Sequence, residues 1–166
     1  CGIATSAFEP MTTSAAHEPD PKENGLVFRQ NLMVHFSHCD PAGMVFFPQY
    51  FVMLNNLVET WFTQGLGINY AALISTRRIG LPTVSLQSEF IAPSRMGETL
   101  DFELQVARLG QKSFTLAVMG RGGAEVRLRL KQVLVTTALD GDHAISIPPD
   151  VRAALARYQF PTGAPI

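Results

Sequence analysis

Residues 35–50 read HFSHCDPAGMVFFPQY, and this stretch decides the fold that the rest of the chain is expected to adopt. Asp40 begins an Asp-Pro-Ala-Gly sequence, which favours a tight turn. After a few small and apolar residues comes Pro48, which suits the first turn of a helix because its missing N–H would have no acceptor there. The stretch therefore predicts a turn that places one carboxylate just before the N-terminus of a helix.

The helix that follows is apolar over most of its circumference. It is expected to run from Pro48 to about Gln64 and to stop at Gly65, a residue type that is common just after a helix C-terminus. Its apolar side chains recur at helical spacing, and they are Phe51, Val52, Met53, Leu54, Leu57, Val58, Trp61 and Phe62. The polar stripe that remains is narrow and consists of Asn55, Asn56, Glu59 and Thr60. A helix of this kind must be wrapped by other structure.

Stretches of alternating apolar and polar residues predict the strands that wrap this helix. A first strand is expected before the turn, at 26–36, and four more follow the helix, at 84–90, 100–106, 114–118 and 126–138. Short connections that contain glycine separate these four strands, so we expect them to pair as antiparallel hairpins. Short helices are expected at 69–77 and 148–157. The order of elements predicts an α+β fold, in which a curved antiparallel five-stranded sheet wraps round one long buried helix.

A row of cationic residues lies on the last predicted strand. Arg127, Arg129 and Lys131 alternate with apolar residues, so the three side chains share one face of the strand. We expect this face to be solvated and the row to pair with Asp101 and Glu103 across the sheet. Contact with phosphate groups of a ligand is the alternative.

The composition is that of one globular domain. The 166 residues are 46% hydrophobic, and we expect a single domain over 25–158 with tails at 1–24 and 159–166. Thirteen basic and fourteen acidic residues give a net charge of -1, which leaves no broad basic surface for nucleic acid or an anionic membrane. An anionic ligand must therefore be held by a few local cations.

Neither the cysteines nor the hydropathy indicates secretion. The two cysteines, Cys1 and Cys39, cannot build a disulfide framework. No apolar run reaches the roughly 18 residues that a bilayer requires, and no secretory signal is visible. We therefore expect a cytoplasmic protein without a membrane partner.

The Asp40 turn carries the groups that acyl-transfer chemistry needs. Asp40 could attack a carbonyl carbon or deprotonate a water molecule, and the sequence leaves both mechanisms open. Backbone N–H groups at the start of the helix would hold the oxyanion that develops on the carbonyl. The candidate catalytic groups are therefore one carboxylate and one or two backbone amides.

The histidines and the cysteine of the same stretch suggest two other kinds of site. A thiolate nucleophile formed by Cys39 and His38 is disfavoured, because neighbours in an extended segment point to opposite faces. His35, His38 and Asp40 match no spacing that is typical of a metal site. We therefore expect no metal.

The segment from Cys39 to Tyr50 resembles the motif of the 4-hydroxybenzoyl-CoA thioesterase family, whose members have the hot-dog fold. Weaker similarity continues at 80–85 and 112–114, and the resemblance covers about residues 27–150. It implies the sheet-and-helix architecture described above and the hydrolysis of an acyl-CoA thioester to a carboxylate and free CoA. CoA would be part of the substrate, so no cofactor is expected.

The resemblance also implies roles for individual residues. Asp40 matches the catalytic aspartate, and Phe47 matches the position whose backbone N–H polarises the thioester carbonyl. We expect the N–H of Phe46 to join that of Phe47 in holding the oxyanion. Lys112 matches the last residue of a basic cluster that contacts the CoA phosphates. The two preceding residues, 110–111, are Gly-Gln where the 4-hydroxybenzoyl enzyme has arginines. We therefore expect Lys112, with Arg108 as the second candidate, to hold the nucleotide.

The acyl group is expected to be aromatic or of medium length. Asn55 stands where the 4-hydroxybenzoyl enzyme has an acid near the ring hydroxyl, and Leu81 replaces a threonine that reaches the same hydroxyl. Glu59 is a further candidate, since some hot-dog thioesterases use a helical acid, although a polar contact between subunits is the alternative role. The apolar pocket is expected to consist of Phe46, Phe47, Leu81 and Trp61.

A second copy of the chain is expected as a partner. The strand faces and the polar stripe of the helix need cover that one chain cannot provide. We expect a homodimer that pairs its sheets edge to edge, assembled further into a dimer of dimers, with the acyl pocket between two subunits. Two alternatives stay open for the function: a thioesterase that acts on acyl carrier protein, and a module that binds acyl-CoA without hydrolysing it.

Overall fold

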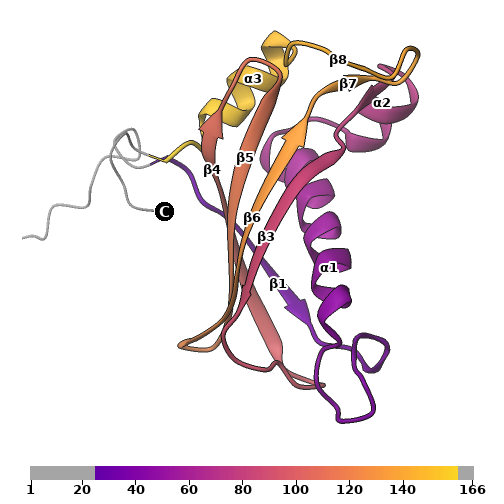
Figure 1. Cartoon of the computed structure of the whole chain (residues 1–166). Coiled ribbons are helices and arrows are strands. Elements are labelled where there is room, and N and C mark those ends of the chain that lie inside the picture. The colour runs from indigo at the N-terminus through magenta and orange to yellow at the C-terminus, as the bar shows by residue number, and fades with distance from the viewer. Residues whose placement is uncertain (1–24, 161–166) are drawn as a thin grey trace, which may run out of the picture.

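The computed structural model describes residues 25–160, which form an open antiparallel sheet with one long helix against one face (Figure 1). The strand order is β1-β4-β5-β6-β3. The strand bounds are β1 Phe28–Met33, β3 Thr83–Phe90, β4 Thr99–Leu109, β5 Ser113–Gly122 and β6 Glu125–Val135. The helix α1 spans Phe47–Thr60 and continues as a π-helical turn over Trp61–Gly65. The predicted α+β architecture is confirmed.

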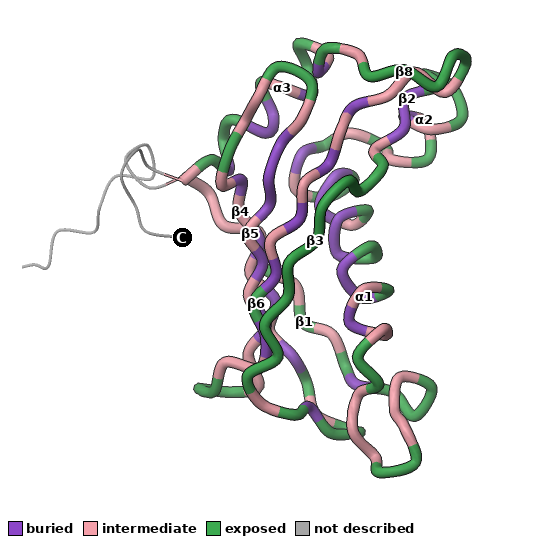
Figure 2. The backbone as a smooth tube through the Cα atoms, viewed as in Figure 1, coloured by how far each residue is buried: buried purple, intermediate pink, exposed green. Residues whose placement is uncertain are grey.

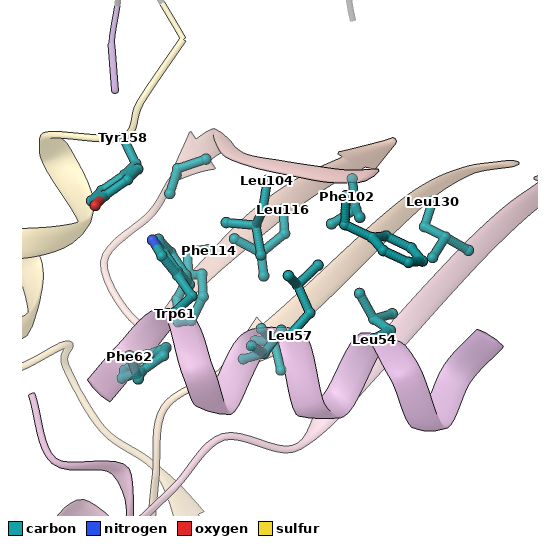
Figure 3. Packing of buried hydrophobic residues seen from close by; sticks show 14 of the residues in the cluster. Leu54, Leu57, Trp61, Phe62, Phe102, Leu104, Phe114, Leu116, Leu130 and Tyr158 are labelled. Atoms are coloured by element: carbon teal, nitrogen blue, oxygen red, sulfur yellow. The ribbon is translucent and has the colours of Figure 1, made fainter. Parts of the chain in front are cut away.

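The core lies between α1 and the inner face of the central strands. Figure 3 shows Leu54 and Leu57 of α1 directed toward Phe102 of β4 and Leu116 of β5. These four side chains are at most 1% exposed, and burying each one stabilises the fold by about 1.5–3 kcal/mol. Every second residue of β4 from Leu100 to Val106 is buried, as the alternating sequence predicted. Trp61 belongs to the same core, at the end of the helix where it packs edge-on against Tyr158.

One predicted pairing is wrong. Hairpins do join β4 to β5 and β5 to β6, but β3 pairs with β6 at the edge of the sheet and does not touch β4. The place beside β4 is taken by β1, where Leu32 lies opposite Leu100. Hydrogen bonds extend this pairing past the strand, since the N–H of Val34 donates to the carbonyl of Glu98. A short connection with a glycine therefore indicates a change of direction, and not which strand becomes the neighbour.

The cationic row on β6 also pairs differently from the prediction. Because β5 lies between β4 and β6, the row does not reach Asp101 and Glu103. Arg129 instead lies 3.8 Å from Glu89 on β3, and both side chains are exposed. Arg127 turns toward the connection between β3 and β4, where its side chain is only 14% exposed.

The remaining elements close the two ends of the sheet. They are the 3-10 turn η1 Phe36–His38, α2 Tyr70–Ser75, α3 Pro149–Ala156 and a small sheet of β2 Ile79–Gly80, β7 Thr137–Ala138 and β8 His143–Ala144. The two short helices were predicted, whereas the small sheet was not. The tails were predicted at 1–24 and 159–166. Residues 1–24 and 161–166 lie outside the described residues, whereas Gln159 forms a parallel bridge with Val106 of β4. Among the described residues, no helix has both the length and the apolar character that crossing a bilayer requires.

The edge strand β3 is exposed along its whole length, as the continuous green of the tube in Figure 2 shows. Val84 is 60% exposed, Leu86 37% and Phe90 46%, although these are apolar residues. The helix is covered by the sheet on one side only, and Val52 on its other side is 50% exposed. This side of the molecule therefore carries an apolar surface beside an open sheet edge.

Candidate active site

The turn that holds Asp40 closes tightly on itself. The backbone N–H of Asp40 donates to the carbonyl of Met44 at 2.8 Å, and the backbone carbonyl of Asp40 accepts from the N–H of Gly43 at 2.9 Å. Gly43 has φ +74°, a conformation that glycine adopts without strain. The carboxylate folds over the turn, where Oδ1 accepts from the N–H of Ala42 at 2.9 Å and of Met44 at 3.3 Å. Among residues 25–160, the second carboxylate oxygen accepts no hydrogen bond, so it is available to a ligand.

The same loop brings the start of α1 back beside the turn. Cys39 and Val45 form an antiparallel bridge, so the residues just before and just after them lie close together. The N–H of Phe46 donates to the carbonyl of His38 at 2.9 Å. This amide was expected to join the oxyanion site, but it is already paired and therefore cannot donate to a ligand in this conformation.

The N–H of Phe47 is the amide that stays free. It belongs to the first residue of α1, where a helix offers no internal acceptor. Pro48 follows without an N–H, and the N–H of Gln49 donates back to the carbonyl of Phe46 at 2.8 Å. Within the part of the chain that the structure describes, the Phe47 N–H has no partner. One free donor therefore opens the helix next to the Asp40 turn.

A cavity of about 320 Å³ lies beside this donor. Its lining consists of Val45, Phe47, Tyr50, Phe90, Ile91, Ala92 and Pro93. Three aromatic rings meet there, since Phe90 stacks on Tyr50 with centroids 5.5 Å apart and meets Phe47 at 6.2 Å. Of the four residues predicted for the pocket, only Phe47 is among those that line this cavity. Trp61 lies instead in the core, beyond the other end of α1.

The connection between β3 and β4, residues 91–98, supports both the cavity and the turn. Ser94 is fully buried, and its hydroxyl accepts from the Tyr50 hydroxyl at 2.8 Å. Its carbonyl accepts from the N–H of Val45 at 2.9 Å. No role was predicted for this connection from the sequence. Tyr50 closes the motif that carries the resemblance, which was the signal that could have drawn attention to its hydroxyl.

The other predicted site residues are not brought to the Asp40 turn within one chain. Asn55 and Glu59 lie on the exposed side of α1, about 12 and 18 Å along the helix from Phe47 at the usual rise. Leu81 precedes β3, at the opposite end of that strand from Phe90. Asn55 therefore lies near the middle of the helix, while Glu59 and Leu81 lie farther from the Asp40 turn.

The candidate cations lie at the far end of the sheet as well. Arg108 is exposed near the end of β4, and Lys112 stands in the β4–β5 hairpin, where its ammonium donates to the carbonyl of Ala144 at 3.1 Å. Asp40 follows β1, whose last residue lies opposite Thr99 at the start of β4. Since β4 has eleven residues, about 35 Å separate its two ends.

The histidines near the turn form no catalytic pair with the cysteine. The Cys39 thiol donates to the carbonyl of His35 at 3.5 Å. The Nδ1 of His38 accepts from the N–H of His35 at 3.1 Å, and the two imidazole rings meet edge to face. Burial lowers the pKa of His38 below its ordinary value, and the positive charge that His35 can carry lowers it further. His38 is therefore held neutral as an acceptor that closes η1.

This arrangement predicts an acid-sensitive fold. Because the pKa of His38 is lower in the folded than in the unfolded protein, its contribution to stability is complete above about pH 6.5 and is lost as pH falls through the folded value. His38→Asn removes the titration and offers an amide oxygen to the His35 N–H. We expect thermal unfolding between pH 5 and 8 to show a shallower loss of stability in this variant. Equal slopes in both proteins would contradict the expectation.

Comparison with known proteins agrees with this architecture. A family model described as "Thioesterase-like superfamily" matches residues 34–155. The 4-hydroxybenzoyl-CoA thioesterase of Pseudomonas sp. strain CBS-3 is 26% identical over 125 residues, which cover 70% of this chain and 89% of that protein. A solved structure of a gentisyl-coenzyme A thioesterase is 27% identical with a TM-score of 0.70, and the match covers 78% of this chain and 99% of that one.

A third protein is similar in fold. A 1,4-dihydroxy-2-naphthoyl-CoA thioesterase from Synechocystis has a TM-score of 0.72 at 23% identity, and the match covers 78% of this chain and 96% of the other. The predicted hot-dog fold and the predicted enzyme class are confirmed by these comparisons. Because the family model spans most of its length, the chain belongs to the thioesterase-like superfamily and is a thioester hydrolase.

Proposed function

We propose that the protein hydrolyses an acyl-CoA thioester to a carboxylate and free CoA. One observation carries the proposal: the N–H of Phe47, which has no partner among residues 25–160, begins α1 beside the Asp40 turn and next to an aromatic cavity. The sequence relation to the 4-hydroxybenzoyl-CoA and gentisyl-coenzyme A thioesterases supports CoA as the thiol.

In the proposed mechanism, the Phe47 N–H donates to the thioester carbonyl oxygen and to the oxyanion that forms on it. A donor placed at this oxygen typically contributes about 2.7–4 kcal/mol to stabilising the transition state. Asp40 either attacks the carbonyl carbon through its free oxygen or removes a proton from the attacking water. Collapse of the tetrahedral intermediate breaks the C–S bond and expels the CoA thiolate, which then takes up a proton. In the general-base route this collapse yields the acid directly, which loses its proton to give the carboxylate. In the nucleophilic route it leaves a mixed anhydride between the acyl group and Asp40, and water hydrolyses this anhydride to release the carboxylate and regenerate Asp40.

The acyl group of the proposed substrate contains an aromatic ring. The rings of Phe47, Tyr50 and Phe90 can meet such a group edge to face or in an offset stack. The cavity, at about 320 Å³, is at the small end of the range for ligand pockets and has room for one aromatic ring. The names of the Pseudomonas relative and of the gentisyl enzyme also specify hydroxylated aromatic acyl groups.

A panel of CoA thioesters tests the proposal, with the released thiol as the readout. We expect benzoyl-CoA and hydroxylated benzoyl-CoA esters to be hydrolysed with a higher kcat/KM than hexanoyl-CoA and palmitoyl-CoA. A higher kcat/KM for the matched acyl carrier protein thioester would favour the carrier-protein enzyme. Binding of CoA esters without release of any thiol would favour a non-catalytic module.

We propose that the chain acts as a homodimer joined through the exposed β3 edges. An uncovered edge with apolar side chains such as Leu86 invites pairing with another strand. A two-fold axis through this edge would run the two β3 strands antiparallel. The end of β3 near Leu81 in one subunit would then lie beside the end at Phe90 in the other. The partner subunit's Asn55, Glu59 and Leu81 would then approach the Phe47 cavity, which they do not reach within one chain.

The position of the cations suggests a further level of assembly. Arg108 and Lys112 lie at the β4 end that is remote from Asp40 and away from the β3 edge. We propose that they bind the CoA phosphates of a site on another subunit, in a dimer of dimers. We expect sedimentation at micromolar concentration to give a dimer or tetramer, and Leu86→Lys to give a monomer with little activity. A monomeric unmutated protein that is fully active would contradict the proposal.

A further inference from the structure

The connection formed by residues 91–98 contacts the two halves of the candidate site. Ile91, Ala92 and Pro93 line the aromatic cavity. The next residues contact the Asp40 turn, since the N–H of Val45 donates to the carbonyl of Ser94 and the N–H of Met96 donates to the carbonyl of Gly43 at 3.1 Å. A group that holds this connection in place therefore sets the cavity wall and the catalytic turn together.

Arg127 is such a group. Its Nη1 donates to the carbonyl of Pro93 at 2.7 Å, and its Nη2 donates to Oε1 of Glu98 at 3.3 Å. Its backbone carbonyl accepts from the N–H of Ile91 at 2.8 Å. One residue of β6 thus contacts the connection near its beginning and at its end. Hydrogen bonds from an ionised donor are stronger than neutral ones, and here the guanidinium is 14% exposed.

Glu98 relays this contact to the turn. While its Oε1 accepts from Arg127, its Oε2 accepts from the backbone N–H of Arg95 at 3.0 Å. Arg95 in turn forms an antiparallel bridge with Met44, whose N–H and carbonyl both bond Asp40. A continuous series of direct contacts therefore runs from the Arg127 guanidinium to the residue that carries the candidate carboxylate.

We infer that Arg127 is a positioning residue of the thioesterase site, a role that rests on the function proposed above. It touches neither the turn nor the cavity, and it acts by fixing residues 91–98 against both. The guanidinium suits this task because it donates in two directions from one rigid plane, which a lysine ammonium cannot do from the same stem. The neighbouring Arg129, which shares the predicted cationic row, is 57% exposed and makes only a 3.8 Å contact with Glu89.

The test compares Arg127→Met with Arg129→Met, which removes the same charge from the same strand. Small displacements of catalytic groups typically cost about 10²-fold in rate, so we expect kcat of Arg127→Met to fall about 10²-fold, with a smaller change in KM. Arg127→Lys, which keeps the positive charge, should not recover the kcat of the unmutated enzyme. Arg129→Met should retain the kcat and KM of the unmutated enzyme. Thermal unfolding of each variant allows kcat to be expressed per folded molecule, so a loss caused by unfolding alone would overturn the inference.

Hydrogen exchange provides a readout that does not depend on activity. The N–H groups of Val45 and Met96 form the bonds between the turn and the connection, and we expect both to exchange faster in Arg127→Met but not in Arg129→Met. Glu98→Gln is a milder variant for the case that Arg127→Met does not fold. Glu98→Gln should speed hydrogen exchange at the same two N–H groups. In the double variant Glu98→Gln with Arg127→Lys, the fold loss of kcat should be smaller than the product of the losses in the two single variants.

The possible failures can be told apart. If the unmutated protein hydrolyses no thioester of the panel, the proposed function fails, while exchange at Val45 still reports whether Arg127 fixes the turn. If exchange and turnover in Arg127→Met equal those in Arg129→Met, Arg127 is an ordinary surface cation and the inference is wrong. Independent, multiplicative effects of the Arg127 and Glu98 changes would overturn the relay through Glu98.

Discussion

Asp40→Asn is expected to lower kcat by about 10³-fold while KM changes little. General base or nucleophilic catalysis requires an ionised carboxylate, and removing such a group typically costs about 10²–10⁴-fold. The asparagine side chain has nearly the same shape, and its amide oxygen can still accept from the N–H groups of Ala42 and Met44. The turn should therefore persist, so that the loss reports on the chemistry and not on the fold. Steady-state kinetics with the best ester of the panel measure it.

A matched control is available at the other end of the molecule. Asp142 is an exposed residue with φ 47°, a conformation that asparagine tolerates well. Asp142→Asn makes the same chemical change outside the candidate site, and we expect it to leave kcat, KM and the thermal unfolding midpoint unchanged. If Asp40→Asn hydrolyses every ester of the panel at the rate of the control, Asp40 is not the catalytic group.

Phe47→Pro is expected to lower kcat by about 10²–10³-fold because it deletes the N–H at the start of α1 that has no partner in the described part of the chain. Proline is well tolerated at the first position of a helix. The residue before a proline must be extended, and Phe46 already has φ -67° and ψ 122°. The substitution therefore removes the donor without forcing a new backbone conformation on the loop.

The loss of the Phe47 ring needs a separate control. Phe47→Ala keeps the backbone N–H and removes the ring from the cavity wall, so it should raise KM for aromatic esters more than it lowers kcat. The difference in kcat between Phe47→Pro and Phe47→Ala then measures the oxyanion donor. Equal kcat values in the two variants would show that this amide does not contribute to the reaction.

Period-two and helical patterns predicted the elements well because they report which side of each element is buried. The alternation of Leu100, Phe102 and Leu104 marks the core face of β4 directly. The same pattern contains no information about lateral neighbours, so it could not tell that β1 rather than β3 borders β4. The edge position of β3 follows from competition between possible pairings over the whole sheet.

The candidate site was predictable only in part for a similar reason. Asp40 could be recognised because turn residues have strong local preferences, and Phe47 because the motif around it resembles that of the thioesterase family. The pairing of the Phe46 amide with the His38 carbonyl arises only when the loop closes on itself. The role of Arg127 depends on a contact with Pro93, 34 positions earlier in the chain, which no local pattern encodes. Contacts in irregular segments depend on the assembled fold.

The loop from Cys39 to Phe46 is already closed before any substrate binds. Several contacts already hold this loop in the free protein. They are the bridge between Cys39 and Val45, two hydrogen bonds from backbone N–H groups to the Asp40 carboxylate, and the hydrogen bond from the Phe46 N–H to the His38 carbonyl. Such a preorganised dipole environment needs little reorganisation energy when charge develops on a bound carbonyl. Arrival of the ligand should then leave the backbone of this loop nearly unmoved, so any slow conformational step in turnover would have to arise elsewhere in the molecule.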